Sequence, residues 1–302
     1  YFAVQTLAGC VDTIDTTVTI FDPPTPNFSI QSACEGDSVY FTNLSTVNAF
    51  PIDSYTWDVQ NNQSVDYTSW DVAHLYPVYD IYAVKLELTD TYGCVDSLIK
   101  IVDVHPLPVA DFAAPGVCFG DQTLFYDSSE VVNGNVIDWL WVLNGGGDTL
   151  SGETPSFTFS QDGFHTVTLI VTTDSGCVDQ VTKNVQVYEL PSANFTSNAA
   201  CEDESMAFTQ MATTPFGVVD QWSWNFGNNT SSSSNPLNAF SAPGTHEVQL
   251  AIETNLGCKD TIQKTVRVYP LPSAFFTWDN NVFGGNDRSV QDESNSVQIT
   301  PG

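Results

Sequence analysis

A cysteine-bearing block recurs along this 302-residue chain at an almost constant interval. The dipeptide Gly-Cys ends at Cys10, Cys94, Cys177 and Cys258, and the intervals between these cysteines are 84, 83 and 81 residues. A second set of cysteines follows the first three Gly-Cys pairs after 24 residues: Cys34, Cys118 and Cys201. Self-similarity at a fixed period indicates a tandem array, and this period is that of a small domain and not of a solenoid turn.

Other landmarks keep the same period. A Pro-rich junction recurs at 23–28, 106–112, 190–195 and 270–276, and an alternating strand pattern runs into three Gly-Cys pairs at 82–88, 165–171 and 246–252. Together they predict complete repeats at 25–106, 107–190 and 191–272, the end of an upstream repeat at 1–24 and the start of a downstream one at 273–302. Because the chain opens inside a repeat, without Met or an apolar signal segment, we expect it to be a segment of a longer protein.

The composition bounds the possible partners. The net charge is −29, from 36 acidic and 7 basic residues. This balance argues against nucleic acid and anionic membranes, because no basic surface is available to neutralise phosphates. The apolar runs are short and alternate with threonine, so we expect no membrane insertion in this segment. Regularly spaced cysteines without C-x-x-C or a neighbouring His indicate a disulfide framework and an extracellular location.

Each repeat contains about seven short β-rich runs separated by Gly, Pro, Asn and Ser, which is typical of an immunoglobulin-like sandwich. The predicted fold class is therefore all-β, with seven-strand sandwiches in a linear array. In the repeat 107–190 the expected strands are 110–114, 123–127, 137–143, 156–160, 164–172 and 180–187. An aromatic-x-Trp pair marks the third strand of each repeat, and its tryptophan is expected to fill the core: Trp57, Trp141 and Trp224.

These residues resemble the PKD repeat, the polycystic-kidney-disease type of immunoglobulin-like domain. The W-x-W-D-F-G segment of that family is matched best by WSWNFG at 222–227, while 56–59 keeps Trp-Asp and 139–143 keeps the tryptophans. The family's aromatic strand, Gly turn and x-V-x-L strand are matched at 239–250 and 157–169. The resemblance covers essentially the whole chain.

A narrower resemblance concerns the two cysteines of each repeat. PKD repeats with a cysteine before the second strand, as at 33–45, and with Gly-Cys-x-Asp later in the repeat look like those of very long surface proteins of gliding Bacteroidetes. The resemblance implies export by type IX secretion and a role as a motility adhesin. The segment 274–302 departs from the pattern, since Val282 stands where the first cysteine would lie.

Strand parity predicts which cysteines pair. In a seven-strand sandwich the loop after the first strand and the turn before the last strand lie at opposite poles, on the order of 20 Å apart, whereas a disulfide needs Cα atoms within about 7 Å. The bottom of one repeat does meet the top of the next. We therefore predict the bridges Cys34–Cys177 and Cys118–Cys258 and expect Cys10, Cys94 and Cys201 to have partners outside this sequence.

No residue pattern indicates an enzyme. His165 and His246 occupy one repeat position, where the remaining repeat has Tyr82, so a structural role outweighs a catalytic one. A nucleophile elbow, a Walker loop and a zinc motif are all missing from the sequence, and we expect no cofactor. Acidic residues beside the cysteines leave one alternative to a solvated surface, which is calcium bound by Asp37 with Asp179 and by Asp121 with Asp260.

Two functions remain. The first is a structural stalk segment of a very long secreted cell-surface adhesin, stiffened by disulfides and used in gliding motility and surface attachment. Its partners would be other domains of the same chain, the outer-membrane secretion or motility machinery and, through other domains, surface polysaccharide. The alternative is a carbohydrate- or protein-binding PKD module of a secreted multidomain protein, which a repeated row of exposed aromatic residues would favour.

Overall fold

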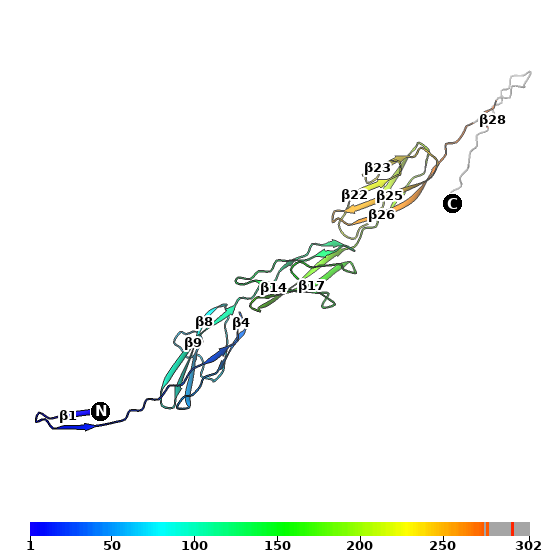
Figure 1. Cartoon of the computed structure of the whole chain (residues 1–302). Helices are drawn as coiled ribbons and strands as arrows, with labels where there is room; N and C mark the ends of the chain where they lie inside the picture. Colours follow the sequence, from blue (N-terminus) through cyan, green and yellow to red (C-terminus); the bar gives the residue numbers. More distant parts are fainter. Residues whose placement is uncertain (275, 278–290, 293–302) are drawn as a thin grey trace, which may run out of the picture. The chain divides into compact units, whose positions relative to one another are not determined.

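A computed structural model describes residues 1–274, 276–277 and 291–292. All secondary-structure elements of the described residues are β-strands (Figure 1). The chain divides into two compact units. The first comprises Tyr1–Ala113, Tyr126–Glu153 and Thr168–Thr182, and the second comprises Ala114–Phe125, Thr154–Val167 and Lys183–Gly302.

The repeat 25–106 forms two sheets around one core. Its strands are β3 (Phe28–Ile30), β4 (Ala33–Cys34), β5 (Ser38–Asn43), β6 (Ile52–Asp58), β7 (Val72–Leu75), β8 (Asp80–Asp90) and β9 (Val95–His105). One sheet has the order β3-β5-β7 and the other β4-β9-β8-β6. On β8 the buried Val84, Leu86 and Leu88 alternate with Lys85 and Glu87, as a strand with one covered face requires.

The repeat 191–272 has the same arrangement. Its strands are β19 (Phe195–Ser197), β20 (Ala200–Cys201), β21 (Ser205–Gln210), β22 (Val219–Asn225), β23 (Thr230–Ser231), β24 (Leu237–Ala239), β25 (Gly244–Thr254) and β26 (Lys259–Tyr269). The sheet orders are β19-β21-β24 and β20-β26-β25-β22-β23, and the neighbours β22, β25 and β26 lie side by side in Figure 1. In both repeats the short strand that carries the cysteine pairs in parallel with the last strand.

The middle repeat also follows this order. Its strands are β10 (Phe112–Ala113), β11 (Val117–Cys118), β12 (Thr123–Leu124), β13 (Tyr126–Asp127), β14 (Val136–Leu143), β15 (Asp148–Ser151), β16 (Ser156–Phe157), β17 (Gly163–Thr173) and β18 (Val178–Tyr188). The main sheet has the order β11-β18-β17-β14-β15, and β10-β13 and β12-β16 form two-stranded sheets.

Two details of the middle repeat differ from the sequence expectation. The first strand, expected at 110–114, is interrupted after β10 and continues as β11, as β3 continues as β4 and β19 as β20 in the other repeats. In the middle repeat Gly116 lets the chain pass the ring of Tyr188, which a Cβ would meet at 2.8 Å. In addition, the Gly-rich turn after β14 is followed by β15, which pairs back with β14 from Leu143 opposite Asp148. Asn144 and Gly145 both have positive φ there, which suits a tight hairpin.

At the ends of the chain, β1 (Phe2–Gln5) and β2 (Val11–Ile14) form an antiparallel pair around Gly9 and Cys10. This pair corresponds to the last two strands expected for an upstream repeat. Near the other end β27 (Phe276–Thr277) pairs with β28 (Gln291–Asp292). The position of Val282 lies outside the described residues. No helix of the described residues is long and apolar enough to cross a membrane.

Each repeat is built around one tryptophan. The side chains of Trp57, Trp141 and Trp224 are fully buried, as the aromatic-x-Trp pattern predicts. Each indole Nε1 donates a hydrogen bond to a backbone carbonyl, at 2.9 Å to Ser69, 2.8 Å to Gly152 and 2.9 Å to Ser233 respectively. A phenylalanine of the first strand meets each indole edge to face, at centroid distances of 5.1 to 5.2 Å. The indole thus gains apolar contact without leaving its N–H unsatisfied.

A lysine of the last strand ties the first strand to the sheet, a contact that the sequence expectations did not include. The Nζ of Lys264 donates to the carbonyl of Phe195 at 2.7 Å and to the side-chain oxygen of Asn194, and it lies 5.1 Å from the centroid of the Phe195 ring. Lys100 makes the same contacts with Phe28 and Asn27. The signal was present in the sequence, because lysine recurs with the repeat period at positions 100, 183 and 264 in a chain with only 7 basic residues.

We predict that Lys264→Met lowers the free energy of unfolding by about 1–2 kcal/mol, because a charge-assisted hydrogen bond and a cation–π contact are lost together. Lys259→Met is the matched control. Lys259 lies on the same strand, but its side chain is 69% exposed and pairs with Glu253 at 3.2 Å, so its loss should cost less than about 0.5 kcal/mol. Urea unfolding of both variants measures the difference, and equal effects would contradict the assigned role.

Candidate functional site: the disulfide junctions

The first cysteine of each repeat lies beside the point where the chain leaves that repeat. Cys34 on β4 is in register with His105 at the end of β9, and the N–H of Glu35 donates to the carbonyl of His105 at 2.8 Å. Likewise, Cys118 is in register with Tyr188, whose carbonyl accepts the N–H of Phe119 at 2.8 Å. Each of these cysteines is therefore fixed to the end of the last strand.

The second cysteine lies at the far end of that same strand. Cys94 directly precedes β9, whose 11 residues separate it from the level of Cys34 by roughly 35 Å at ~3.3 Å per residue. The turn that presents it depends on glycine, because Gly93, Gly176 and Gly257 all have φ near +84° (83°, 83° and 85°). The two cysteines of one repeat are thus far too distant to bond to each other.

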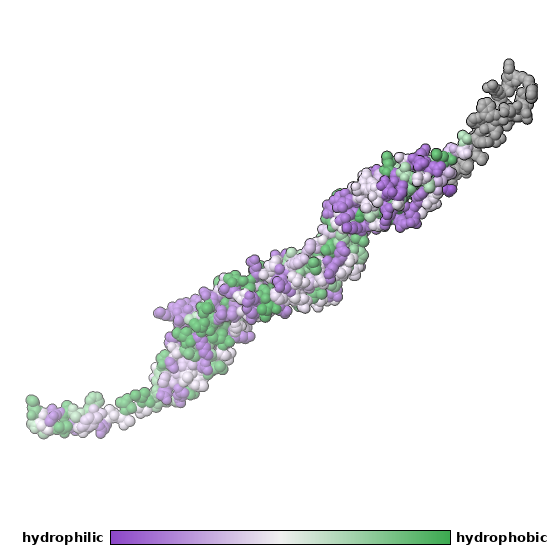
Figure 2. Space-filling model, turned by 45° about the horizontal axis from the view of Figure 1, so that its top comes forward, coloured by the Kyte–Doolittle hydropathy of each residue, from purple (hydrophilic) through white to green (hydrophobic). Residues whose placement is uncertain are grey.

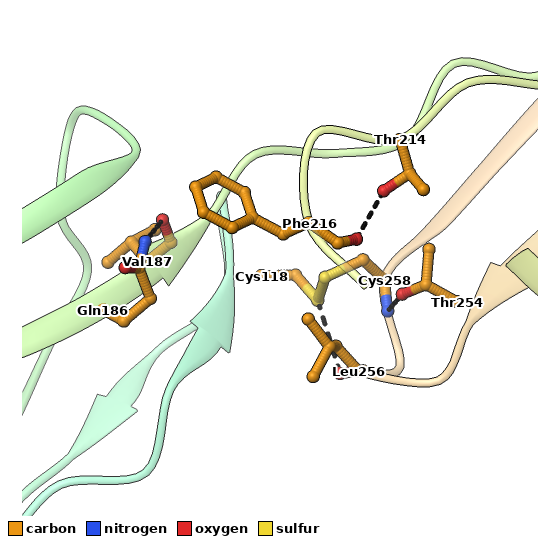
Figure 3. The surroundings of a disulfide bond; sticks show 8 residues. All are labelled: Cys118, Gln186, Val187, Thr214, Phe216, Thr254, Leu256 and Cys258. Carbon is orange, nitrogen blue, oxygen red and sulfur yellow. Dashed lines mark hydrogen bonds between the residues drawn. A yellow bond between two sulfur atoms is a disulfide. The ribbon is translucent and has the colours of Figure 1, made fainter. Parts of the chain in front are cut away.

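The structure joins Cys34 to Cys177 and Cys118 to Cys258, which are the two pairs that strand parity predicts. Their Cα atoms are 5.7 Å and 5.4 Å apart, within the range of a disulfide. Figure 3 shows the second bridge, in which the Sγ of Cys118 lies 4.0 Å from the carbonyl oxygen of Leu256. Each bridge lies within one compact unit and connects one repeat to the next.

An aspartate two residues after the bonded cysteine holds the start of its own repeat, where the linker from the preceding repeat enters. The carboxylate of Asp179 accepts the N–H of Ala110 at 2.8 Å, and that of Asp260 accepts the N–H of Ala193 at 2.7 Å. In the repeat 25–106 the equivalent position is Pro26, which has no N–H to give, and Asp96 accepts the N–H of Ser97 instead. The aspartate at this position therefore anchors the start of a repeat only where that start supplies a backbone N–H.

Aromatic side chains contact one another at the junctions. The ring of Tyr188, where β18 ends, lies 5.9 Å from that of Phe216, in a loop of the following repeat. At the start of the repeat 25–106, Phe21 contacts Phe50 at 4.7 Å, and Phe50 contacts Tyr92 at 3.9 Å. Apolar contact thus accompanies the covalent and hydrogen-bonded links.

Cys10, Cys94 and Cys201 are free thiols in this structure. Desolvation and the carboxyl group of Asp90 raise the pKa of the Cys94 thiol, and the backbone N–H of Cys94 donates to Asp90 at 2.9 Å. The bonded Cys177 and Cys258 have a threonine at this position, whose hydroxyl accepts the same N–H at 3.1 Å. The acceptor of this N–H is therefore a carboxylate at Cys94 and a hydroxyl at the two bonded cysteines.

The calcium candidates do not gather into a metal site. Among the described residues, no group of three or more His, Cys, Asp or Glu side chains is arranged to hold a metal ion. Asp179 and Asp260 already accept backbone N–H groups, and a pair of carboxylates falls short of the six to eight oxygen ligands that calcium takes. A calcium ion at Asp37 with Asp179 or Asp121 with Asp260 stays a prediction.

The histidines have structural positions. His165 stacks on Phe159 at 4.0 Å and His246 on Phe240 at 4.3 Å, and each Nε2 lies within 2.9 Å of a backbone carbonyl four residues earlier. Tyr82 stacks on Tyr76 at 4.1 Å and donates to the carbonyl of Val78 in the same way. This position requires a flat ring that stacks on its aromatic neighbour and donates one hydrogen bond to the carbonyl, so imidazole and phenol can replace each other.

Two further polar groups have local partners. Burial lowers the pKa of His74, whose Nδ1 lies 2.9 Å from the hydroxyl of Tyr67. A pocket beside Trp57 is lined by Asp58, Lys85 and Glu87 among others. Lys85 pairs with Glu87 at 2.6 Å, and Asp58 accepts the N–H groups of Asn62 and Gln63.

Comparison with known proteins identifies the family of these repeats. The family model described as PKD domain matches residues 105–187 and 188–269, more than half of the chain. A curated relative, the pre-pro-metalloprotease PrtV of Vibrio cholerae serotype O1, is 31% identical over 158 residues. This match covers 51% of the present chain but 16% of the relative, so the chain spans a small part of the relative's length.

Two solved structures are similar to single repeats. The PKD1 domain of Vibrio anguillarum Epp is 28% identical and has a TM-score of 0.25, with 27% of this chain and 93% of that chain covered. The PKD1 domain of Vibrio cholerae PrtV is also 28% identical, with a TM-score of 0.24 and coverages of 27% and 96%.

We predict that Asp260→Ala lowers the free energy of unfolding by about 1–3 kcal/mol, since the N–H of Ala193 loses a charged acceptor. Asp96→Ala is the matched control, because Pro26 offers no equivalent donor, and it should change stability by less than about 0.5 kcal/mol. Thermal or urea unfolding compares the variants. If Asp96→Ala were as costly as Asp260→Ala, the assignment of the Ala193 contact would be wrong.

The calcium prediction has a direct test. Because Asp179 and Asp260, one carboxylate of each candidate pair, already accept a backbone N–H, we expect the melting temperature to be the same in excess calcium and in excess chelator. An ion that binds only the folded state must raise apparent stability, so a fall of several degrees in chelator would instead establish a site. Asp37→Asn and Asp121→Asn would then show which pair holds the ion.

Proposed function

Since the chain belongs to the PKD-domain family, we propose that it is a stalk segment of a very long secreted cell-surface adhesin. The stalk carries a distal binding region away from the cell and serves gliding motility and surface attachment. One observation carries the proposal: neighbouring repeats are covalently joined a second time, by Cys34–Cys177 and Cys118–Cys258. A chain that only displayed independent domains would gain nothing from such bridges.

The junction chemistry favours stiffness. Between His105 and Ala110 the peptide contains Pro106 and Pro108, which fix φ and favour an extended path. The same two ends are held by the bridge from Cys34 to Cys177, beside His105 at one side and Asp179 at the other. A hinge between His105 and Ala110 would have to strain two covalent links, and the Asp179 hydrogen bond fixes Ala110 to its own repeat. Bending at the junction is therefore opposed by more than a linker.

The surface suits an extended polymer in water. Figure 2 shows hydrophilic and hydrophobic residues intermixed on the visible face. The net charge of −29 opposes side-by-side association of neighbouring chains. PKD domains occur in secreted proteins such as PrtV, so an extracellular location follows from the family. The cell surface, and partnership with other domains of the chain and with the secretion or motility machinery, are part of the proposal.

A specific observation favours the alternative, a protein- or carbohydrate-binding module. In the repeat 25–106 the outer face of β8 and β9 exposes Ile81, Ile99 and Ile101, with exposed fractions of 65%, 50% and 60%. The positions of Ile99 and Ile101 carry Thr182 and Asn184 in the middle repeat, which are polar. In the middle repeat only the position of Ile81 keeps an exposed apolar side chain, Phe164, which is 73% exposed. The surface supports at most a local binding role beside the stalk.

Small-angle scattering of the oxidised chain tests the stalk. We expect a rod whose maximum dimension is several times its width, with little bending between repeats. Replacing all four bonded cysteines with serine should increase flexibility, seen as a broader distribution of end-to-end distances, while the sandwich cores stay folded. The unbonded Cys94→Ser is the control and should leave the scattering unchanged.

A compact particle would contradict the stalk proposal, and so would a flexible chain whose shape is the same with and without the bridges. The binding module would then be the better proposal. Its test is the double variant Ile99→Thr with Ile101→Asn, which introduces the residues of the middle repeat and should abolish binding without changing stability.

A further inference from the structure

The two disulfide loops overlap along the chain. One bridge closes a loop across 143 residues and the other across 140 residues. The second loop opens at Cys118, inside the first, and closes at Cys258, beyond it. The segment from Cys118 to Cys177 therefore belongs to both loops. Bridges within single repeats would give two separate loops that share no residue.

Because the two loops overlap, a pulling force can follow more than one covalent path through the chain. Pulled from both ends, a chain with neither bridge must transmit force through every residue. With one bridge, force passes from Cys34 directly to Cys177, or from Cys118 directly to Cys258, and bypasses the enclosed loop. With both, the shortest path runs to Cys34, crosses to Cys177, returns to Cys118, crosses to Cys258 and continues. This path avoids residues 35–117 and 178–257.

The bridges are anchored where load enters the linkers. Cys34 is in register with His105, and the Glu35 N–H bonds to the His105 carbonyl, so the cysteine and the departing peptide share one end of the repeat. On the other side Cys177 directly precedes β18, and Asp179 holds Ala110. The linker and the bridge thus span the same junction in parallel. Cys118, Tyr188 and Asp260 repeat this arrangement.

We propose that the overlapping bridges have a mechanical function: they form a two-stage length limiter, in which each bridge backs up the other. With both bridges the taut chain is shorter than the fully extended polypeptide by about 165 residues, or roughly 550 Å at ~3.4 Å per residue. Loss of either bridge lengthens the taut chain by about 22–25 residues, roughly 80 Å. Loss of the remaining bridge then releases its full 143 or 140 residues.

The limiter also restrains the segments that the shortest path avoids. With both bridges, residues 118–177 are drawn out, whereas the segments 35–117 and 178–257 span the same two points with more residues, so neither is drawn to its full contour. Loss of one bridge by reduction still leaves one loop, closed by the other bridge, outside the path of force. The use of the limiter in a loaded filament rests on the proposed stalk function, whereas the limiter itself depends only on the connectivity.

Single-molecule stretching of the full chain by handles at its two termini tests the proposal. Four proteins are compared: the oxidised chain, Cys34→Ser with Cys177→Ser, Cys118→Ser with Cys258→Ser, and the variant with all four replacements. The readout is the contour length after all repeats have unfolded, so it does not depend on the stability of any variant. Wild-type protein in reductant gives the fully released length without any substitution.

The expected result is strongly non-additive. Each paired variant should be longer than wild type by about 80 Å, and the fourfold variant by about 550 Å. Separate loops within repeats, such as Cys34–Cys94 and Cys118–Cys177, would instead release about 200 Å each; every paired variant opens two of them and would be longer by about 400 Å, and that outcome would overturn the proposal. Equal lengths for oxidised and reduced wild type would overturn it too. If scattering showed a flexible chain while the stretching results were non-additive, the stalk function would be refuted and the length limiter would stand.

Discussion

A disulfide forms only between cysteines whose Cα atoms lie within about 7 Å, and in each repeat the two cysteines lie at opposite ends of the last strand. This constraint determines the organisation of the chain. Cys34 and Cys94 are separated by the 11 residues of β9, so each must find its partner in a neighbouring repeat. The covalent joining of repeats follows from where one strand begins and ends. Linker, aspartate and aromatic contacts then complete a junction that the bridge has already positioned.

Much of the fold could be predicted because the repeat period, the alternation of apolar residues and the Trp-bearing strand each have one physical explanation. The bridge pairs also followed, since strand parity needs only the number of strands. The interrupted first strand and β15 could not be predicted from propensity alone. Both depend on local backbone geometry and contacts, such as the close approach of Gly116 to the Tyr188 ring and the positive φ of Asn144.

The aspartates show why residue types alone were insufficient at the junction. Asp179 and Asp260 suggested calcium because carboxylates near a domain boundary are typical ligands. Their acceptor role depends on a partner some 70 residues away, the N–H of Ala110 or Ala193, and the partner position in the first complete repeat is proline. The lysine contacts were missed for a related reason: a single lysine in a strand carries no signal, and only its recurrence at the repeat period does. Recurrence between repeats is therefore more informative than residue type.

Each junction takes one cysteine from the repeat before it and one from the repeat after it. Every complete repeat therefore carries one cysteine for each of its two neighbours. Duplication or deletion of a whole repeat in the gene leaves every interior junction with a matching pair, whereas a bridge between specialised partners would leave orphans. The length of such an array is thus free to change over evolution by whole repeats, with no compensating mutation needed at the points of recombination.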